Sequence, residues 1–302
     1  AEIEASAQAD DDRETLARDP TVRFLKHLLK WFKGEFFTWV NQPDCPVCGS
    51  GTSFAGMVAA TSEERRYGAS RVEGYKCQQC GTPVRFPRYN DPGKLLETRR
   101  GRCGEWANCF TLVCISLGYF ARYVLDFTDH VWTEVYSAAE NRFLHLDSCE
   151  AALDSPSMYE VGWGKDLTYI FAFSKYGVTD VIKRYTVNFP KVLSRRTDMH
   201  ENDLAGLIRE MNSCPTVRRA WSGLDSPKTE ETRWIFDTEQ LELSLLGRGA
   251  TRQLVDAEVR GRTSGDIAWR RRRGEVDEKG SEDVAGGEED DERAKSGVTK
   301  GA

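Results

Sequence analysis

Long apolar runs are missing from this sequence of 302 residues. Its apolar stretches are far shorter than the roughly 20 residues that a membrane-spanning helix requires, so no membrane protein is expected. An excess of positive charge is missing too, because 42 lysines and arginines stand against 48 acidic residues, giving a net charge of −6. This balance argues against general nucleic-acid binding. The sequence shows no internal repeat, and its length suffices to bury one sizeable core with a small additional module.

Large apolar side chains are scarce at both ends of the sequence. We therefore expect residues 1–20 to form a disordered acidic lead-in and residues 274–302 to form a disordered acidic tail. Between them, the apolar pattern predicts a folded core over residues 21–195, with a cysteine-bearing module at 41–88 inside it. A mostly helical C-terminal extension is expected over residues 196–273.

Hydrophobic periodicity predicts several elements of the core and of the extension. Helical spacing occurs in two stretches, one around Leu28 and one around Leu207 that ends at Cys214. Alternating patterns predict strands over 119–127, 169–173 and 178–187.

Four of the nine cysteines form two Cys-x-x-Cys-Gly units, at Cys45, Cys48, Cys77 and Cys80. Four thiolates in two such pairs can surround a tetrahedral zinc ion, and they leave no open position for catalysis, which predicts one structural Zn²⁺. Two separate redox or structural pairs are the less favoured alternative. An odd number of cysteines fits a reducing compartment better than a disulfide framework. We therefore expect a cytoplasmic location, with the nucleus as an additional site.

Cys103 differs from the other cysteines because it stands at the beginning of a predicted helix. A turn of small residues precedes it, and the following apolar positions have helical spacing up to Gly118. The free N–H groups and the dipole at a helix start favour a thiolate. Nearby arginines add positive charge, although a solvated basic turn is an equal alternative: Arg99, Arg100 and Arg102. Cys109 and Cys114 continue the apolar face and are expected to be buried small hydrophobes.

A β-hairpin is predicted from two alternating stretches, 129–136 and 141–147. If Tyr136 and Asn141 close a four-residue loop, the register pairs His130 with Asp147, Trp132 with His145, and Glu134 with Phe143, all on one face. A histidine opposed to an aspartate can act as a base with its orienting acid, which a cysteine nucleophile needs. His145 is a rival base on the same face. Alternatively, the hairpin face is half-solvated and its polar pairs are coincidental, with no catalytic role.

Four motifs closely resemble the cytosolic peptide:N-glycanases, a family within the transglutaminase-like superfamily: Gly101–Asn108, Asp129–Tyr136, Leu144–Glu150 and Glu160–Lys165. The similarity runs from about Phe32 to about Arg196. It implies an α+β fold of the transglutaminase-like (papain-like) type, with an antiparallel sheet and an inserted four-cysteine zinc module. Residue by residue, the family's nucleophile falls on Cys103, its base on His130 and its acid on Asp147.

The resemblance also implies residues that bind substrate. Trp39 matches a tryptophan that lines the glycan cleft of the family, and Glu134 and Glu150 match carboxylates that hold sugar hydroxyl or amide groups. Phe143 stands where some members carry tryptophan, which puts glycan affinity in question. Residues 261–270 resemble a segment that follows the catalytic core in many relatives, and no mechanism is assigned to it.

The activity implied is hydrolysis of the amide that joins an N-linked glycan to asparagine in misfolded glycoproteins, leaving aspartate. The implied partners are unfolded N-glycoproteins, recognised at the chitobiose core, and a ubiquitin-receptor shuttle that serves the proteasome. A protein-crosslinking transglutaminase is a second hypothesis, but crosslinking needs no glycan clamp. An inactive glycan- or protein-binding scaffold is a third, and the intact set of Cys103, His130 and Asp147 disfavours it.

Overall fold

The computed structural model describes residues 19–216, 230–246 and 254–275. The predicted lead-in and tail therefore fall almost wholly outside the described residues, and helix α3 (Pro20–Trp31) already begins inside the range given to the lead-in. Among the described helices, none is both long and apolar enough to cross a membrane.

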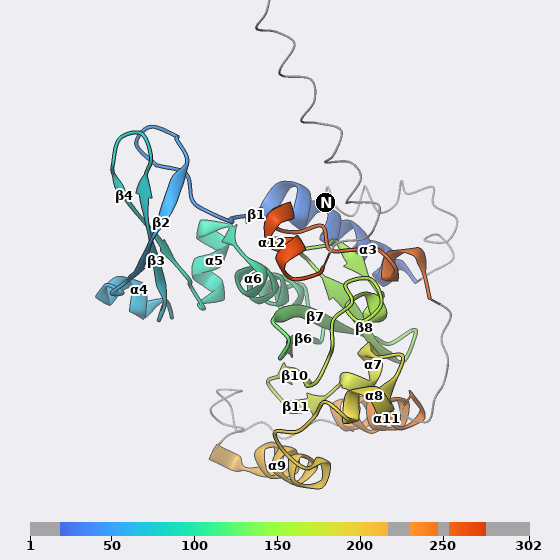
Figure 1. Ribbon diagram of the computed structural model, residues 1–302. Coiled ribbons are helices and arrows are strands. Elements are labelled where there is room, and N and C mark those ends of the chain that lie inside the picture. Colours follow the sequence, from blue (N-terminus) through green and yellow to red (C-terminus); the bar gives the residue numbers. More distant parts are fainter. Residues whose placement is uncertain (1–18, 217–229, 247–253, 276–302) are drawn as a thin grey trace, which may run out of the picture.

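A six-stranded antiparallel sheet forms the centre of the fold, in the order β11-β10-β6-β7-β8-β9 (Figure 1). Its strands are β6 (Ala121–Asp126), β7 (His130–Ser137), β8 (Arg142–Asp147), β9 (Ala152–Leu153), β10 (Ile170–Ser174) and β11 (Gly177–Asp180). Together with the flanking helices, this sheet confirms the predicted α+β class.

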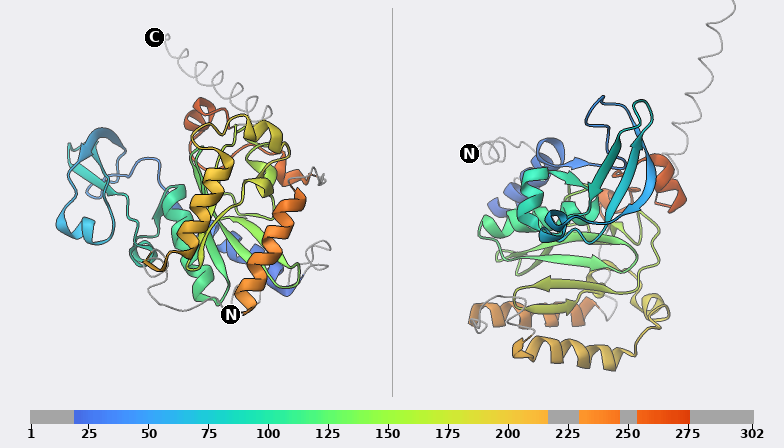
Figure 2. Two further views of the ribbon diagram at one scale, coloured as in Figure 1. Left: turned by 90° about the horizontal axis from the view of Figure 1, so that it is seen from below. Right: turned by 90° about the vertical axis from the view of Figure 1, so that its left-hand side faces the viewer.

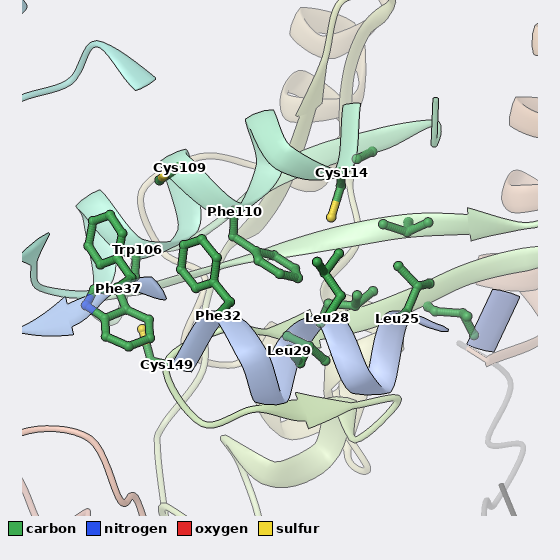
Figure 3. Packing of buried hydrophobic residues seen from close by; sticks show 14 of the residues in the cluster. Leu25, Leu28, Leu29, Phe32, Phe37, Trp106, Cys109, Phe110, Cys114 and Cys149 are labelled. Carbon is green, nitrogen blue, oxygen red and sulfur yellow. The ribbon is translucent and has the colours of Figure 1, made fainter. Parts of the chain in front are cut away.

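One face of the sheet packs against α3, the π-helical turn η1 (Phe32–Phe36) and α6 (Cys103–Ser116). Figure 3 shows α3 and α6 directing apolar side chains toward each other across this layer. Phe32 lies at its centre, with its ring centroid 5.0 Å from that of Phe110 and 5.3 Å from that of Phe37. The packing therefore fixes the axis of the helix on which Cys103 lies.

The opposite face carries a second cluster that includes Trp132, Tyr159, Trp163 and Tyr185. It is covered by η2 (Pro156–Met158), α7 (Ile182–Tyr185) and α8 (Phe189–Leu193). The strand predicted over 178–187 is wrong in its second half, because Asp180 accepts a hydrogen bond from the Ile182 backbone (3.2 Å) and α7 begins there.

Helices α9 (Glu201–Ser213) and α11 (Glu230–Leu246) lie near β10 and β11, at the end of the molecule away from α3 (Figure 2). The helix predicted around Leu207 is thus confirmed, and Cys214 follows its last residue. Toward the other end, η3 (Asp256–Glu258) and α12 (Ile267–Arg272) return the chain to the neighbourhood of β1 (Thr38–Trp39).

The cysteine-bearing module stands beside the main body (Figures 1 and 2). It consists of β2 (Thr52–Val58), α4 (Ser62–Arg66), β3 (Val72–Cys77) and β4 (Pro83–Pro87). Then α5 (Pro92–Thr98) begins after its Asp91 cap, and β5 (Arg100–Gly101) pairs in parallel with β1. Two arginines tie the module to α6, because Arg88 bonds both Glu73 and Glu105, and Arg102 bonds Glu73.

The hairpin of β7 and β8 forms as predicted, but its register is shifted by two residues. Tyr136 pairs with Phe143 and Glu134 pairs with His145, so that the loop spans residues 138–141. The loop closes one step later because Asn141 takes a left-handed conformation (φ 53°), which asparagine tolerates, and accepts a hydrogen bond from the Tyr136 hydroxyl (2.6 Å). A shift of two keeps every side chain on its predicted face.

We expect Phe32→Ala to lower the free energy of unfolding by about 3–5 kcal/mol, because it empties a fully buried site among aromatic rings. Denaturant unfolding measures the effect. Phe54→Ala is the matched control, since Phe54 on β2 is 57% exposed, and its effect should be about 1 kcal/mol or less. Equal losses in the two variants would contradict this view of the core.

Candidate active site

Cys103 is the first residue of α6, as the sequence predicts. The Glu105 carboxylate fixes this helix start by accepting a hydrogen bond from the Arg102 backbone N–H (2.9 Å). Gly101 makes the arrangement possible, because a Cβ there would lie only 2.3 Å from the Cβ of Glu105. The thiol is half-buried at the positive end of the helix dipole.

His130 begins β7 and Asp147 ends β8, and the structure joins their side chains. The His130 Nε2 and Asp147 Oδ2 atoms are 2.7 Å apart, and both side chains are fully buried. Asp147 is itself held by the Tyr159 hydroxyl (3.0 Å) and by the backbone N–H groups of Cys149 (2.8 Å) and Glu150 (3.2 Å). The acid therefore has a fixed position from which it orients the imidazole.

The remaining ring nitrogen of His130, Nδ1, is buried and makes no hydrogen bond of good geometry with any described residue, while the Cys103 thiol interacts with the ring. Tryptophan and tyrosine rings surround the imidazole, with Trp163 at 4.9 Å and Tyr159 at 5.3 Å between centroids. This apolar enclosure leaves Nδ1 as the site that can take the thiol proton.

The charges favour an ionised pair of Cys103 and His130. Burial opposes a Cys103 thiolate, but the interaction with His130 and its charge, aided by Arg262, lower the Cys103 pKa overall. Burial likewise opposes a charged His130, but the charge and hydrogen bond of Asp147 raise the His130 pKa overall. Burial would raise the pKa of Asp147, and the charge of His130 lowers it instead. The site thus favours a thiolate beside an imidazolium.

His145, the rival base, lies on the same face but serves another purpose. Its Nε2 atom is 2.6 Å from the Tyr159 hydroxyl, and Ser155 donates a backbone hydrogen bond to its Nδ1 (3.3 Å). Burial lowers the pKa of His145 to about 4. At neutral pH it is therefore a neutral partner of Tyr159, which in turn fixes Asp147.

Two of the predicted substrate-binding residues lie in a buried ionic cluster instead of a cleft. Glu134 is fully buried and pairs with Arg184 (2.6 Å) and Arg122, and the Tyr185 hydroxyl donates a further bond to it (2.6 Å). Burial works against the charged form, but the arginines bring the Glu134 pKa to about 2. Phe143 is also fully buried, with the Arg122 guanidinium 3.5 Å above its ring. Their placement corrects the assignment of these two side chains to glycan contact.

The other two predicted substrate-binding residues lie near the reaction centre. Trp39 is half-buried and lines a cleft of about 490 Å³ together with Trp106 and Cys149. Glu150 accepts hydrogen bonds from the Thr263 (2.8 Å) and Ser264 (3.0 Å) backbones, so the chain's own C-terminal extension engages its carboxylate.

Tyr159 and Arg262 also belong to this site, although their sequence context does not predict it. Arg262 is a buried cation near Cys103, and its stretch was noted only as a family-like segment. The arginines that precede Cys103 in sequence do not take this place. Arg102, for example, bonds Glu73 (2.7 Å) and the Val40 carbonyl (3.1 Å). No sequence signal pointed to Tyr159.

The four paired cysteines come together in the module. The sulfur atoms of Cys45, Cys48, Cys77 and Cys80 all lie within 4.8 Å of one another. The separations are 3.4 Å for Cys48–Cys77 and 3.6 Å for both Cys45–Cys80 and Cys48–Cys80. This cluster could hold a metal ion.

Histidine titration tests the proposed charge pattern, and the chain has only four histidines. We expect Asp147→Asn to lower the His130 pKa by about one pH unit or more, because it removes the charge that favours the imidazolium. NMR of the imidazole signals measures it. Asp166→Asn, at a side chain that is 76% exposed, is the control. An unchanged His130 pKa in Asp147→Asn would refute the role given to Asp147.

Comparison with known proteins agrees with this geometry. A model of the transglutaminase-like superfamily matches residues 52–148, and a model of the Rad4 transglutaminase-like domain matches residues 127–241. A solved structure of Rad4-Rad23 bound to a 6-4 photoproduct UV lesion is 14% identical, with a TM-score of 0.47, and covers 84% of this chain and 53% of that chain. That weak likeness carries no functional conclusion.

Curated relatives are more similar. The peptide-N(4)-(N-acetyl-beta-glucosaminyl)asparagine amidase of Arabidopsis thaliana is 48% identical over 252 residues, 83% of this chain and 34% of that protein. Its namesakes from Gallus gallus and Homo sapiens are 47% and 45% identical over 83% of this chain and 37% of their own length. The chain spans about a third of the length of these relatives. By sequence it is a homologue of the peptide-N(4)-(N-acetyl-beta-glucosaminyl)asparagine amidases that carries a transglutaminase-like domain.

Proposed function

We propose that this chain hydrolyses the amide bond between an N-linked glycan and asparagine in unfolded glycoproteins. The observation that carries the proposal is the buried His130–Asp147 pair (2.7 Å) beside a cysteine at a helix start. The same residues give Cys103 a lowered pKa and His130 a raised one, which is the state that thiol acyl transfer requires. The names of the relatives support glycosylated asparagine as the substrate.

The reaction follows from these positions. The Cys103 thiolate attacks the side-chain amide carbon of the substrate, and the carbonyl oxygen takes the negative charge. The Cys103 backbone N–H, which is free at the helix start, is a candidate donor to that oxygen. When the carbon–nitrogen bond breaks, the His130 imidazolium gives its proton to the leaving glycosylamine, and a thioester remains on Cys103.

A second half-reaction restores the enzyme. Neutral His130 takes a proton from water, the hydroxide attacks the thioester carbon, and the thiolate leaves. The peptide then carries aspartate in place of asparagine. The glycosylamine hydrolyses in solution to free glycan and ammonia, and His130 is again protonated beside a Cys103 thiolate.

The cleft lined by Trp39, Trp106 and Cys149 supports recognition of a sugar close to the reaction centre. Trp39 presents an aromatic face, which suits the apolar face of a sugar ring, and Lys33 and Asn41 add polar groups to the lining. Because the Cys103 thiol is half-buried, an asparagine side chain must be free of its own protein's fold to reach it, which favours an unfolded substrate.

We further propose that the four-cysteine cluster holds zinc. Four sulfur ligands at about 2.3 Å in a tetrahedron lie about 3.8 Å apart, close to the 3.4–3.6 Å separations found here. A full set of four thiolates leaves no position for substrate, so the ion would stabilise the module and take no part in the chemistry. The Arg88 and Arg102 bonds would then connect a rigid module to the start of α6.

A cytoplasmic location, with the nucleus as an additional site, is part of this proposal, because thiols used for metal binding and catalysis require reducing conditions. A ubiquitin-receptor shuttle for the proteasome is a further proposed partner. Exposed apolar side chains on α9 and α11 support a docking surface for it, among them Leu207, Trp234 and Leu241.

Glycan release is the direct test. We expect the full chain to remove the whole glycan from a denatured high-mannose glycoprotein and, in ¹⁸O-water, to leave aspartate that contains one ¹⁸O atom. Mass spectrometry of the peptide and of the glycan measures both. Cys103→Ala should abolish release, because it removes the nucleophile. Cys109→Ala is the matched control, since Cys109 is a buried cysteine of the same helix.

The other hypotheses predict different products. Incorporation of a primary amine into glutamine would indicate a crosslinking transglutaminase. Glycan retained on a column without any change in mass would indicate a scaffold. Glycan release by Cys103→Ala at the rate of the unsubstituted chain would contradict the thiol mechanism.

Metal analysis tests the module. We expect one zinc per chain, lost in Cys48→Ser, and a lower melting temperature after its removal, because the module has only a small apolar core. Cys214→Ser is the control, since Cys214 lies outside the cluster. A full zinc content in Cys48→Ser would contradict the assignment.

A further inference from the structure

Residues 261–275, the end of the C-terminal extension and the first two residues of the predicted tail, lie against the reaction centre although they are remote in sequence. They are bonded to both loops that position the His130–Asp147 pair. Glu150, just after Asp147, accepts hydrogen bonds from the Thr263 (2.8 Å) and Ser264 (3.0 Å) backbones. Asp129, just before His130, accepts one from the Arg273 guanidinium (2.7 Å). This segment, called the 261–275 segment below, is therefore built into the site.

Arg262 is the most deeply buried cation of this segment, at 1% exposure. Its Nη1 bonds Glu275 (2.9 Å) and its Nε bonds the Ser264 hydroxyl (3.0 Å). Three tryptophan rings enclose the guanidinium, with centroids at 4.4–5.7 Å: Trp269, Trp163 and Trp39. Its Nη2 is buried and has no hydrogen-bond partner among the described residues. A buried cation with an unpaired nitrogen is costly, so a negative group close by would compensate it.

Arg262 lies close to the reaction centre, because the Trp163 ring that it contacts at 4.7 Å is itself 4.9 Å from the His130 ring. Cys103 supplies the compensating charge when it is ionised. Burial lowers the pKa of Arg262, but the Cys103 charge, together with the charge and hydrogen bond of Glu275, raises it overall. The effect is mutual, because Arg262 lowers the Cys103 pKa. Arg262 also lowers the His130 pKa, since two cations close together repel each other.

The other groups around Cys103 do not replace Arg262. Tyr123 and Cys149 are buried with raised pKa values, so both are neutral near pH 7. Asp147 acts on the cysteine through His130. Asp129 raises the Cys103 pKa, and the ion pair with Arg273 offsets its charge. The two cations that lower the Cys103 pKa are therefore His130 and Arg262, while Glu275 and Arg273 act through their ion pairs with Arg262 and Asp129.

We propose that Arg262 is a positioning residue that holds the Cys103 sulfur as a thiolate, and that the 261–275 segment completes the reaction centre. This inference rests on the proposed function, because the hydrolysis uses the Cys103 thiolate that Arg262 stabilises. It goes beyond that function by assigning a role to a part of the chain outside the predicted core.

The test is the pH dependence of Cys103 alkylation by iodoacetamide in the full chain, resolved by peptide mass spectrometry. Removal of the Arg262 charge in Arg262→Met should raise the pH at which Cys103 is half reactive by about one pH unit or more. Arg262→Lys, which keeps the charge, should restore most of the original profile. Arg272→Met is the matched control on exposed surface of α12 and should leave the profile unchanged.

A second variant keeps the proposal testable if Arg262→Met fails to fold. Glu275→Gln removes the acid paired with Arg262, so the cation acts more strongly on the sulfur, and the half-reactive pH should fall. A profile that moves in neither Arg262→Met nor Glu275→Gln would overturn the proposal. If Arg262→Met does not fold, an unchanged pH profile of Cys103 alkylation in Glu275→Gln would by itself overturn the proposal.

The alkylation result is independent of glycan release. If the chain releases no glycan but the two variants shift the Cys103 profile in opposite directions, the proposed function fails and the role of Arg262 stands. If the chain is active, Arg262→Met should recover glycan release as the pH rises, because a higher pH restores the thiolate. A merely structural arginine would lower the activity equally at every pH.

Discussion

A negative charge on the half-buried Cys103 sulfur must form beside a fully buried histidine and aspartate, and the rest of the site follows from that constraint. Burial favours the neutral thiol and the neutral imidazole alike. The structure opposes this preference by placing charges in order: Asp147 behind His130, His130 beside the sulfur, and Arg262 in a tryptophan enclosure nearby. Hydrogen bonds from Tyr159 and from two backbone N–H groups keep Asp147 fixed, and the charge of His130 keeps it ionised.

Buried ion pairs also explain how parts that are distant in sequence form one body. Arg88 and Arg102 join the cysteine-bearing module to the start of α6. Arg122 and Arg184, in the sheet and in α7, meet Glu239 from α11. Removing one partner of such a pair leaves an uncompensated charge, at a cost of about 3–5 kcal/mol. The ion pairs of Glu239 with Arg122 and Arg184 therefore hold the C-terminal extension to the core.

Local features of the site could be predicted because short-range rules govern them. Cys103 at a helix start, Gly118 with positive φ after that helix and the two Cys-x-x-Cys units all follow from neighbouring residues. The hairpin register was wrong by two residues, since loop closure depends on Asn141 adopting a left-handed conformation. The faces were nevertheless right, because side chains alternate with period two and an even shift preserves that alternation.

Charge partners across the fold could not be predicted, because nothing in the pattern of a strand says which element will cover it. Glu134 lies on the face of His130, yet α7 covers it and gives it Arg184 and Tyr185 as partners instead of a sugar. Arg102 is adjacent to Cys103 in sequence, yet its guanidinium forms an ion pair with Glu73. The arginine that lowers the Cys103 pKa is Arg262, which lies in the C-terminal extension. A residue's type and face therefore predict chemistry only where the covering element is known. His130 and Asp147 are hydrogen-bonded although they are not directly opposed in the observed register, because both side chains lie on one face of neighbouring strands.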